Sequence, residues 1–196
     1  GSAALLVATT AADNTAIGTL ALTANSSGTD NTAVGYAAGD AVTTGDANTF
    51  VGDNAGGGTT TADNNTAVGA SALLVNTTGA TNVAVGTLSL GANTTAANNT
   101  AVGASALGAN TTGTANTAVG KGASATSTTA NNNTVVGYNA LTLGTGAGNT
   151  AVGAYCMQSA TGALACTAVG EAAGAAMTTG GGNTAIGTYA LSTVTN

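Results

Sequence analysis

The hydrophobic and polar positions of this chain follow a repeat of 17 residues. The pentapeptide Asn-Thr-Ala-Val/Ile-Gly, or a close variant, begins eleven times. It starts at Asn14, Asn31, Asn48, Asn65, Asn82, Asn99, Asn116, Asn133, Asn149, Cys166 and Asn183. Every step is 17 residues except the step from Asn133 to Asn149, which is 16. We number the positions of each repeat from 1, at this Asn, to 17. Such short-period self-similarity is typical of architectures in which each unit packs on its neighbours.

Positions 2 to 4 are the best strand candidate, because they read Thr-Ala-Val in most copies and are followed by an invariant Gly. A unit of this length is too short for a helical hairpin repeat, which needs more than about 30 residues. We therefore predict an all-β, parallel β-solenoid of about eleven 17-residue coils. Residues 1–196 form one repeat domain, with residues 1–13 as a partial first coil. At roughly 4.8 Å per coil, the rod would be about 50 Å long.

Identical positions of successive coils are expected to stack into ladders. Position 4 is always Val or Ile, so we predict that it points into the coil. Gly at position 5 is expected to adopt a positive φ or to permit a close backbone approach. The predicted ladders include Asn31, Asn65 and Asn99; Val34, Val68 and Val102; and Gly35, Gly69 and Gly103. Positions 8 and 9 are expected to begin a second short strand or a corner, and positions 12 to 15 to form a turn.

Alternation along the strand then places position 3 on the outside, although it is Ala, Phe50 or Val135 and never polar. A strand that is apolar on both faces is usually covered on both. We therefore expect lateral association with copies of the same chain, most simply as a homotrimer. Neither end shows the atypical polar cap of solenoids. The chain is accordingly expected to be a piece of a longer fibre or to stack end to end as a homopolymer.

The charge and composition of the chain limit which partners and activities we expect for it. Charged residues are 4% of the chain, His is absent, and Lys121 is the only basic residue. Nucleic acids need Lys or Arg to neutralise their phosphates, so we expect no nucleic-acid partner. No apolar stretch approaches the ~18 to 20 residues of a spanning helix, so we expect no membrane span. Lys121 and Glu171 are placed three coils apart, and no titratable groups converge for acid–base chemistry. We expect no enzyme activity and no cofactor.

An acidic strip is the candidate metal site. Asp13 and Asp30 share position 17, and Asp46 and Asp63 share position 16, beside the Asn ladder. Stacked carboxylates with Asn oxygens would suit Ca²⁺. The same residues also suit turns, where Asp is common.

The two cysteines are the candidate disulfide. Cys156 replaces an Ala at position 8, and Cys166 replaces the ladder Asn about half a coil later. They either form a bridge across the thin interior, with Cα atoms about 5.5 Å apart, or remain two buried free thiols.

Two outward-facing groups are candidates for binding. A Thr ladder at position 13, with only Ser26 deviating, suggests an ice- or surface-binding function, because a flat array of Thr can order water. Tyr36 and Tyr138 share position 6, whereas Tyr155 and Tyr189 share position 7. Outward aromatic residues of this kind suit contact with a surface receptor or a glycan.

Residues 65–73 and 99–107 both read Asn-Thr-Ala-Val-Gly-Ala-Ser-Ala-Leu. This motif resembles the head repeats of trimeric autotransporter adhesins, and it is still more similar to the repeat arrays of phage and environmental bacterial tail-fibre-type proteins. The resemblance implies a left-handed parallel β-roll, a trimer and a fibre role. We therefore expect a structural fibre or adhesin segment, extracellular, on a cell surface or virion tail, acting as a rigid self-associating shaft. An end-to-end filament subunit and an ice- or surface-binding solenoid are the alternatives.

Overall fold

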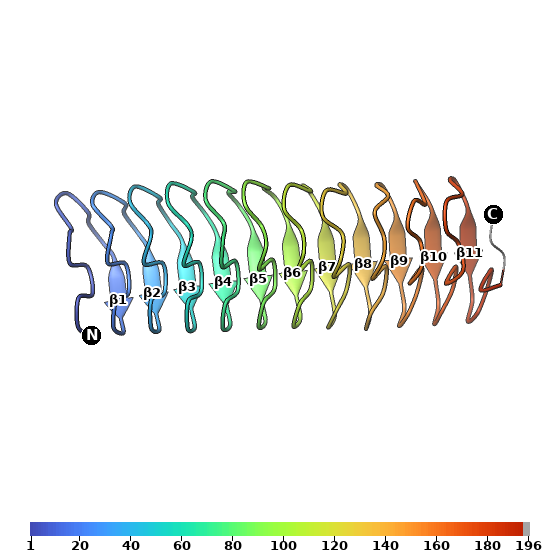
Figure 1. Ribbon diagram of the computed structural model, residues 1–196, viewed down its shortest axis with the longest axis horizontal. Helices are drawn as coiled ribbons and strands as arrows, with labels where there is room; N and C mark the ends of the chain where they lie inside the picture. Colours follow the sequence, from blue (N-terminus) through green and yellow to red (C-terminus); the bar gives the residue numbers. More distant parts are fainter. Residues whose placement is uncertain (194–196) are drawn as a thin grey trace.

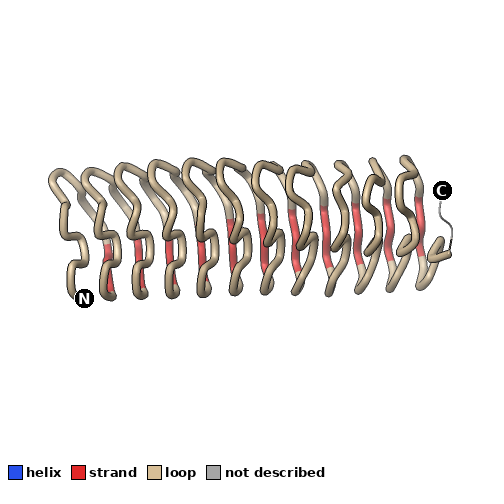
Figure 2. The backbone as a smooth tube through the Cα atoms, viewed as in Figure 1, coloured by secondary structure: helices blue, strands red, loops and turns tan. Residues whose placement is uncertain are grey.

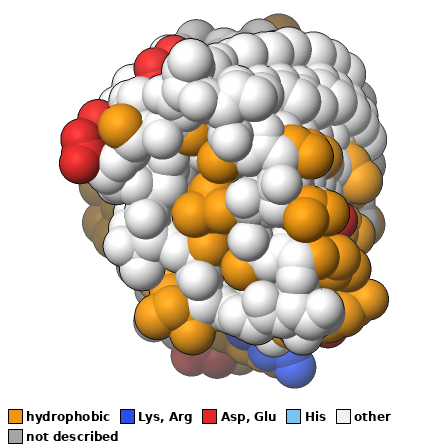
Figure 3. Space-filling view, turned by 90° about the vertical axis from the view of Figure 1, so that its left-hand side faces the viewer, with side chains coloured by type: hydrophobic (Ala, Val, Ile, Leu, Met, Phe, Trp, Pro, Cys, Tyr) orange, Lys and Arg blue, Asp and Glu red, His pale blue; other side chains and the backbone are white. Residues whose placement is uncertain are grey.

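The chain forms a rod of stacked coils, with its first coil at one end and its last described coil at the other (Figure 1). The computed structural model describes residues 1–193, so the predicted continuation of the last coil to Asn196 lies outside the described residues. Residues 1–13 stack on the first full coil, because Leu5 N–H donates to Ala21 O and Thr9 N–H to Ser26 O. Figure 3 looks along the rod from this end, where hydrophobic side chains occupy the middle of the coil.

Each coil contributes one strand of three residues to a single parallel sheet. The strands are β1 (Thr15–Ile17), β2 (Thr32–Val34), β3 (Thr49–Val51), β4 (Thr66–Val68), β5 (Val83–Val85), β6 (Thr100–Val102), β7 (Thr117–Val119), β8 (Thr134–Val136), β9 (Thr150–Val152), β10 (Thr167–Val169) and β11 (Thr184–Ile186). They pair in chain order from β1 to β11. No helix occurs between residues 1 and 193. The prediction of an all-β solenoid with coils of about 17 residues is confirmed.

Successive strands pair in register, so that each residue meets its equivalent in the next coil. Val34 pairs with Val51, and Val51 pairs with Val68. The 16-residue step does not shift this register, because β8 and β9 still align Thr134 with Thr150. The shorter coil loses its residue at position 14, between Thr145 and Gly146. Asn133 Nδ2 donates to Gly146 O, 13 residues ahead in the sequence. In the next coil, which has full length, Asn149 Nδ2 donates to Ala163 O, 14 residues ahead.

Only positions 2 to 4 form regular strands, and the rest of each coil consists of turns and loops (Figure 2). Positions 8 and 9, expected to be a second strand or a corner, form a corner. The backbone of the corner also bonds between coils, as in the donation of Leu107 N–H to Ala123 O at 3.0 Å. Inter-coil hydrogen bonds therefore hold the loops as well as the sheet.

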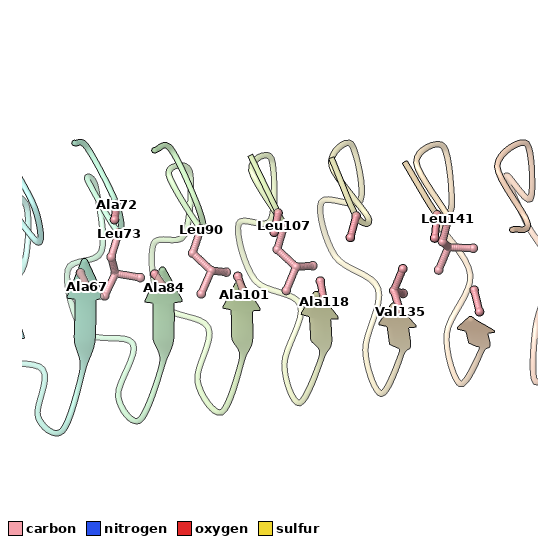
Figure 4. Packing of buried hydrophobic residues seen from close by; sticks show 14 of the residues in the cluster. Ala67, Ala72, Leu73, Ala84, Leu90, Ala101, Leu107, Ala118, Val135 and Leu141 are labelled. Carbon is pink, nitrogen blue, oxygen red and sulfur yellow. The ribbon is translucent and has the colours of Figure 1, made fainter. Parts of the chain in front are cut away.

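The sheet faces the core with position 3, not with position 4. Ala67, Ala84 and Ala101 are fully buried, whereas Val102 remains 37% exposed. The prediction that Val34, Val68 and Val102 point into the coil is therefore wrong, as is the outward placement of position 3. The leucines at position 9 lie across the interior from these alanines (Figure 4). The space left between strand and corner fits a methyl group at most coils, which explains why position 3 is usually Ala.

The exception at Phe50 is balanced by two glycines. Phe50 is the largest buried side chain, and position 9 is Gly39 in the coil before it and Gly56 in its own coil. A Cβ on Gly56 would lie 2.4 Å from the Phe50 ring, and a Cβ on Gly39 would lie 2.7 Å from it. The ring thus occupies the space of the missing leucines, and the total volume of the core is preserved.

The invariant glycine of position 5 meets two requirements at once. Gly35, Gly69 and Gly103 have φ values of 143°, 131° and 132°. A Cβ on Gly103 would lie 2.6 Å from the carbonyl carbon and oxygen of Gly120 in the next coil. Only glycine provides both this backbone conformation and this close stacking of turns.

Candidate functional site

The outward side of the sheet is a regular surface that runs along the rod. We call it the outer face and define it as positions 2 and 4 of β1 to β11. Position 2 is Thr in every strand except for Val83, and position 4 is Val or Ile throughout. Val102, Val119, Val136 and Val169 are each 37% exposed. The outer face is therefore an uncharged, partly apolar surface that repeats with every coil.

The threonines of the outer face are free to bond water. Among residues 1–193, no hydroxyl group of a position 2 Thr makes a hydrogen bond within the protein. The predicted Thr ladder of position 13 differs, because its hydroxyls bond between coils. Thr77 Oγ1 donates to Thr94 O, and Thr94 Oγ1 donates to Thr111 O, at 3.0 and 3.1 Å. The ladder that the sequence singled out therefore holds coils together.

The Asn ladder of position 1 is buried and bonded in both directions. Asn82 N–H donates to Asn65 Oδ1 at 2.9 Å, and Asn82 Nδ2 donates to Ala96 O at 2.9 Å. At the one break in the ladder, Cys166 N–H still donates to Asn149 Oδ1, at 3.0 Å. The side chains at this position satisfy the position 15 carbonyl of their own coil and the position 1 N–H of the next coil, so they stabilise the rod and are not available to a ligand.

A second Asn ladder inside the coil was not predicted. At position 12, Asn93 Nδ2 donates to Asn76 Oδ1 at 2.9 Å, and Asn110 Nδ2 donates to Asn93 Oδ1 at 3.0 Å. All three residues are fully buried. Ser127 replaces Asn in the next coil, and Asn110 Oδ1 is left as a buried oxygen without a partner. The sequence contains one sign of this second ladder, because each of these asparagines follows a Leu at position 9 of the same coil.

The acidic strip acts on the backbone of neighbouring coils. Asp46 Oδ1 accepts a hydrogen bond from Thr29 N–H at 2.6 Å, and Asp63 Oδ1 accepts one from Asp46 N–H at 2.8 Å. Asp13 and Asp30 have left-handed backbones, with φ of 56° and 59°. Within the described range, no three His, Cys, Asp or Glu side chains are grouped as a metal ion would require. These residues serve as turn and inter-coil bonding groups.

Cys156 and Cys166 are free thiols, and the candidate disulfide between them is not formed. Both side chains are buried. Burial raises the pKa of the Cys156 thiol to about 11, and Cys156 Sγ donates to Ala168 O at 3.3 Å. Because the thiolate is the nucleophilic form, Cys156 is unreactive near neutral pH.

The fold and its ladders define a β-solenoid repeat protein with a repeating outer face. Within residues 1–193, no helix is long and apolar enough to cross a membrane. No family model matches the chain, and the comparisons with curated proteins and with solved structures give no match either.

Proposed function

We propose that this chain is a rigid shaft segment of an extracellular or virion-surface fibre, and that it associates laterally with copies of itself through the outer face. The observation that carries the proposal is the continuous Val/Ile ladder on the outward side of an in-register sheet. A strand that is apolar on both sides is usually covered on both. Here the core covers position 3, and a second copy would cover position 4.

A copy of the same chain is the partner that fits this surface best. The outer face has no charged residue and repeats with every coil from β1 to β11. A partner must therefore offer an uncharged surface with the same spacing, roughly 4.8 Å per coil. A three-fold bundle brings three such faces around one axis and covers all of them. The resemblance of residues 65–73 and 99–107 to trimeric adhesin heads and tail-fibre arrays supports the same arrangement.

The construction of the rod also suits a mechanical role. Backbone hydrogen bonds link each coil to the next at the strand, the corner and the position 13 turn. The free energy of folding of such arrays is approximately the sum of the stability of each repeat and the interactions between neighbouring repeats. A shaft of this kind needs no catalytic group or cofactor.

Sedimentation velocity of wild-type protein and of Val102→Lys tests the proposal. We expect the wild type to sediment as a trimer or larger species, and Val102→Lys to dissociate it, because lysine would place charges against one another in the interface. Thr112→Lys, at an exposed turn away from the outer face, is the matched control and should keep the wild-type mass. A monomeric wild type, or equal dissociation by both variants, contradicts lateral association through this face.

A second function is favoured by the free hydroxyls of the same face. Thr at position 2 and Val at position 4 point to one side and alternate with buried residues, as a flat water-ordering array requires. If the wild type sediments as a monomer, we propose ice or surface binding instead. Ice shaping that Thr100→Lys abolishes would support this alternative, and unshaped ice crystals in the presence of the wild type would exclude it.

A further inference from the structure

Five residues of unusual type lie in a row along one edge of the rod. Lys121, Tyr138, Tyr155, Glu171 and Tyr189 come from five successive coils, each at position 6 or 7. Tyr155 N–H donates to Tyr138 O at 2.9 Å, and Tyr189 N–H donates to Glu171 O at 2.9 Å. Position 7 of a coil is thus bonded to position 6 of the coil before it. We call these five residues the edge strip.

The 17-residue repeat does not account for the edge strip. It holds the only Lys, the only Glu and three of the four Tyr residues of the chain. In the first half of the rod, positions 6 and 7 offer only Tyr36 as an aromatic residue. The edge strip is therefore a local feature, in contrast to the outer face, which repeats in all coils.

The aromatic rings of the strip are available to a partner. Tyr138 is 44% exposed and Tyr155 is 39% exposed, and their rings form an edge-to-face pair with centroids 5.4 Å apart. Tyr189 is exposed as well. The other residue of positions 6 and 7 is small in two of these coils, Ala154 beside Tyr155 and Ala172 beside Glu171. None of the three tyrosines belongs to the buried core of the coil, so core packing gives no reason for their presence.

We infer that the edge strip binds a neutral, extended glycan. Tyrosine combines an apolar ring face, which packs on the C–H face of a pyranose, with a hydroxyl group that bonds sugar hydroxyls. The ammonium group of Lys121 donates hydrogen bonds and the carboxylate of Glu171 accepts them. Their opposite charges cancel, which favours an uncharged ligand over a polyanion.

The spacing of the strip residues suits a linear ligand that lies along the rod. Five coils at roughly 4.8 Å per coil place its outermost residues about 20 Å apart, which suits a row of a few sugar rings. A second copy of the chain fits this edge less well, because these residue types do not recur at positions 6 and 7 of every coil. Glycan binding does not depend on lateral association, since the edge strip and the outer face use different positions of the coil.

Affinity electrophoresis in native gels tests the inference. The wild type, Tyr138→Ala/Tyr155→Ala and the control Tyr36→Ala are run through gels that contain hydroxyethyl cellulose, xylan or dextran. We expect at least one polysaccharide to retard the wild type, and the double variant to bind at least about ten-fold more weakly, as expected when a central aromatic anchor is removed. Tyr36→Ala, which removes a lone exposed tyrosine, should be retarded like the wild type.

Two results overturn the inference. One is the absence of retardation of the wild type in all three gels. The other is equal weakening by Tyr36→Ala and by the double variant, which would show that the paired rings have no special role. Sedimentation velocity of the double variant separates this test from the shaft proposal. An unchanged mass is expected, and a mass that falls while retardation persists would make the edge a protein interface instead.

Discussion

Replacing Phe50 by alanine is expected to destabilise the rod by about 3–5 kcal/mol, the usual cost of removing a buried aromatic side chain. The effect should be at the upper end of this range. Gly39 and Gly56 line the ring and have no side chains that could move into the cavity. Chemical denaturation followed by circular dichroism measures the loss, and Thr61→Ala, at an exposed turn, provides the surface control.

A second substitution should restore much of this stability. Gly56→Leu alone is expected to destabilise, because its side chain would overlap the Phe50 ring. In the Phe50→Ala background, the same leucine recreates the combination found in the coils of β4, β5 and β6, which have Ala at position 3 and Leu at position 9. The backbone is already suited to it, since φ is 62° at Gly56 and 54° at Leu73. If the double variant loses as much stability as the two single variants together, the proposed sharing of core volume is incorrect.

Gly103→Ala is expected to destabilise the rod strongly, although it adds only one methyl group. The added Cβ would lie 2.6 Å from the carbonyl of Gly120, and φ at this residue is 132°. A strained backbone of this kind costs about 1–3 kcal/mol by itself. The next coil must also move, which weakens the hydrogen bond from Gly120 N–H to Val102 O. We expect a total loss of more than about 3 kcal/mol in chemical denaturation.

Gly187→Ala is the matched control for this substitution. Gly187 occupies the same position with φ of 117°, but a Cβ there meets nothing within 4 Å. Gly187→Ala should therefore lose stability through backbone strain alone, without a clash of the added methyl group with the next coil. Equal losses for the two variants would show that close stacking of coils is not what fixes glycine at this position.

Much of the fold follows from the period of the sequence. Asn, Thr, Val and Gly recur every 17 residues, and only stacked parallel coils put equivalent residues in contact at so short a spacing. The positive φ or close approach expected at Gly35 followed from the same reasoning. The 16-residue step shows that one residue is missing from this coil, and the structure places the loss at position 14, between Thr145 and Gly146.

The inward and outward faces could not be assigned from the same pattern. The invariance of Val34 and its equivalents suggested burial, but Val and Ile also suit an exposed strand position. The deciding information was the volume of the interior, which depends on how closely Leu73 and the other corner residues approach the strand. Three-residue strands give too little alternation to distinguish the faces. The inner ladder of Asn76, Asn93 and Asn110 was hidden for a related reason, because an Asn-Thr-Thr sequence is typical of an exposed turn.

The comparison of Ala101→Lys with Val102→Lys tests the central structural claim most directly. Adjacent residues of β6 receive the same charged side chain, and the far-ultraviolet circular dichroism and thermal unfolding of both variants are measured. Ala101 is fully buried and Val102 is 37% exposed. We predict that Val102→Lys keeps the wild-type spectrum and a cooperative transition, whereas Ala101→Lys does not fold, because an unpaired charge in the thin core is too costly. A folded Ala101→Lys with an unfolded Val102→Lys would contradict the account.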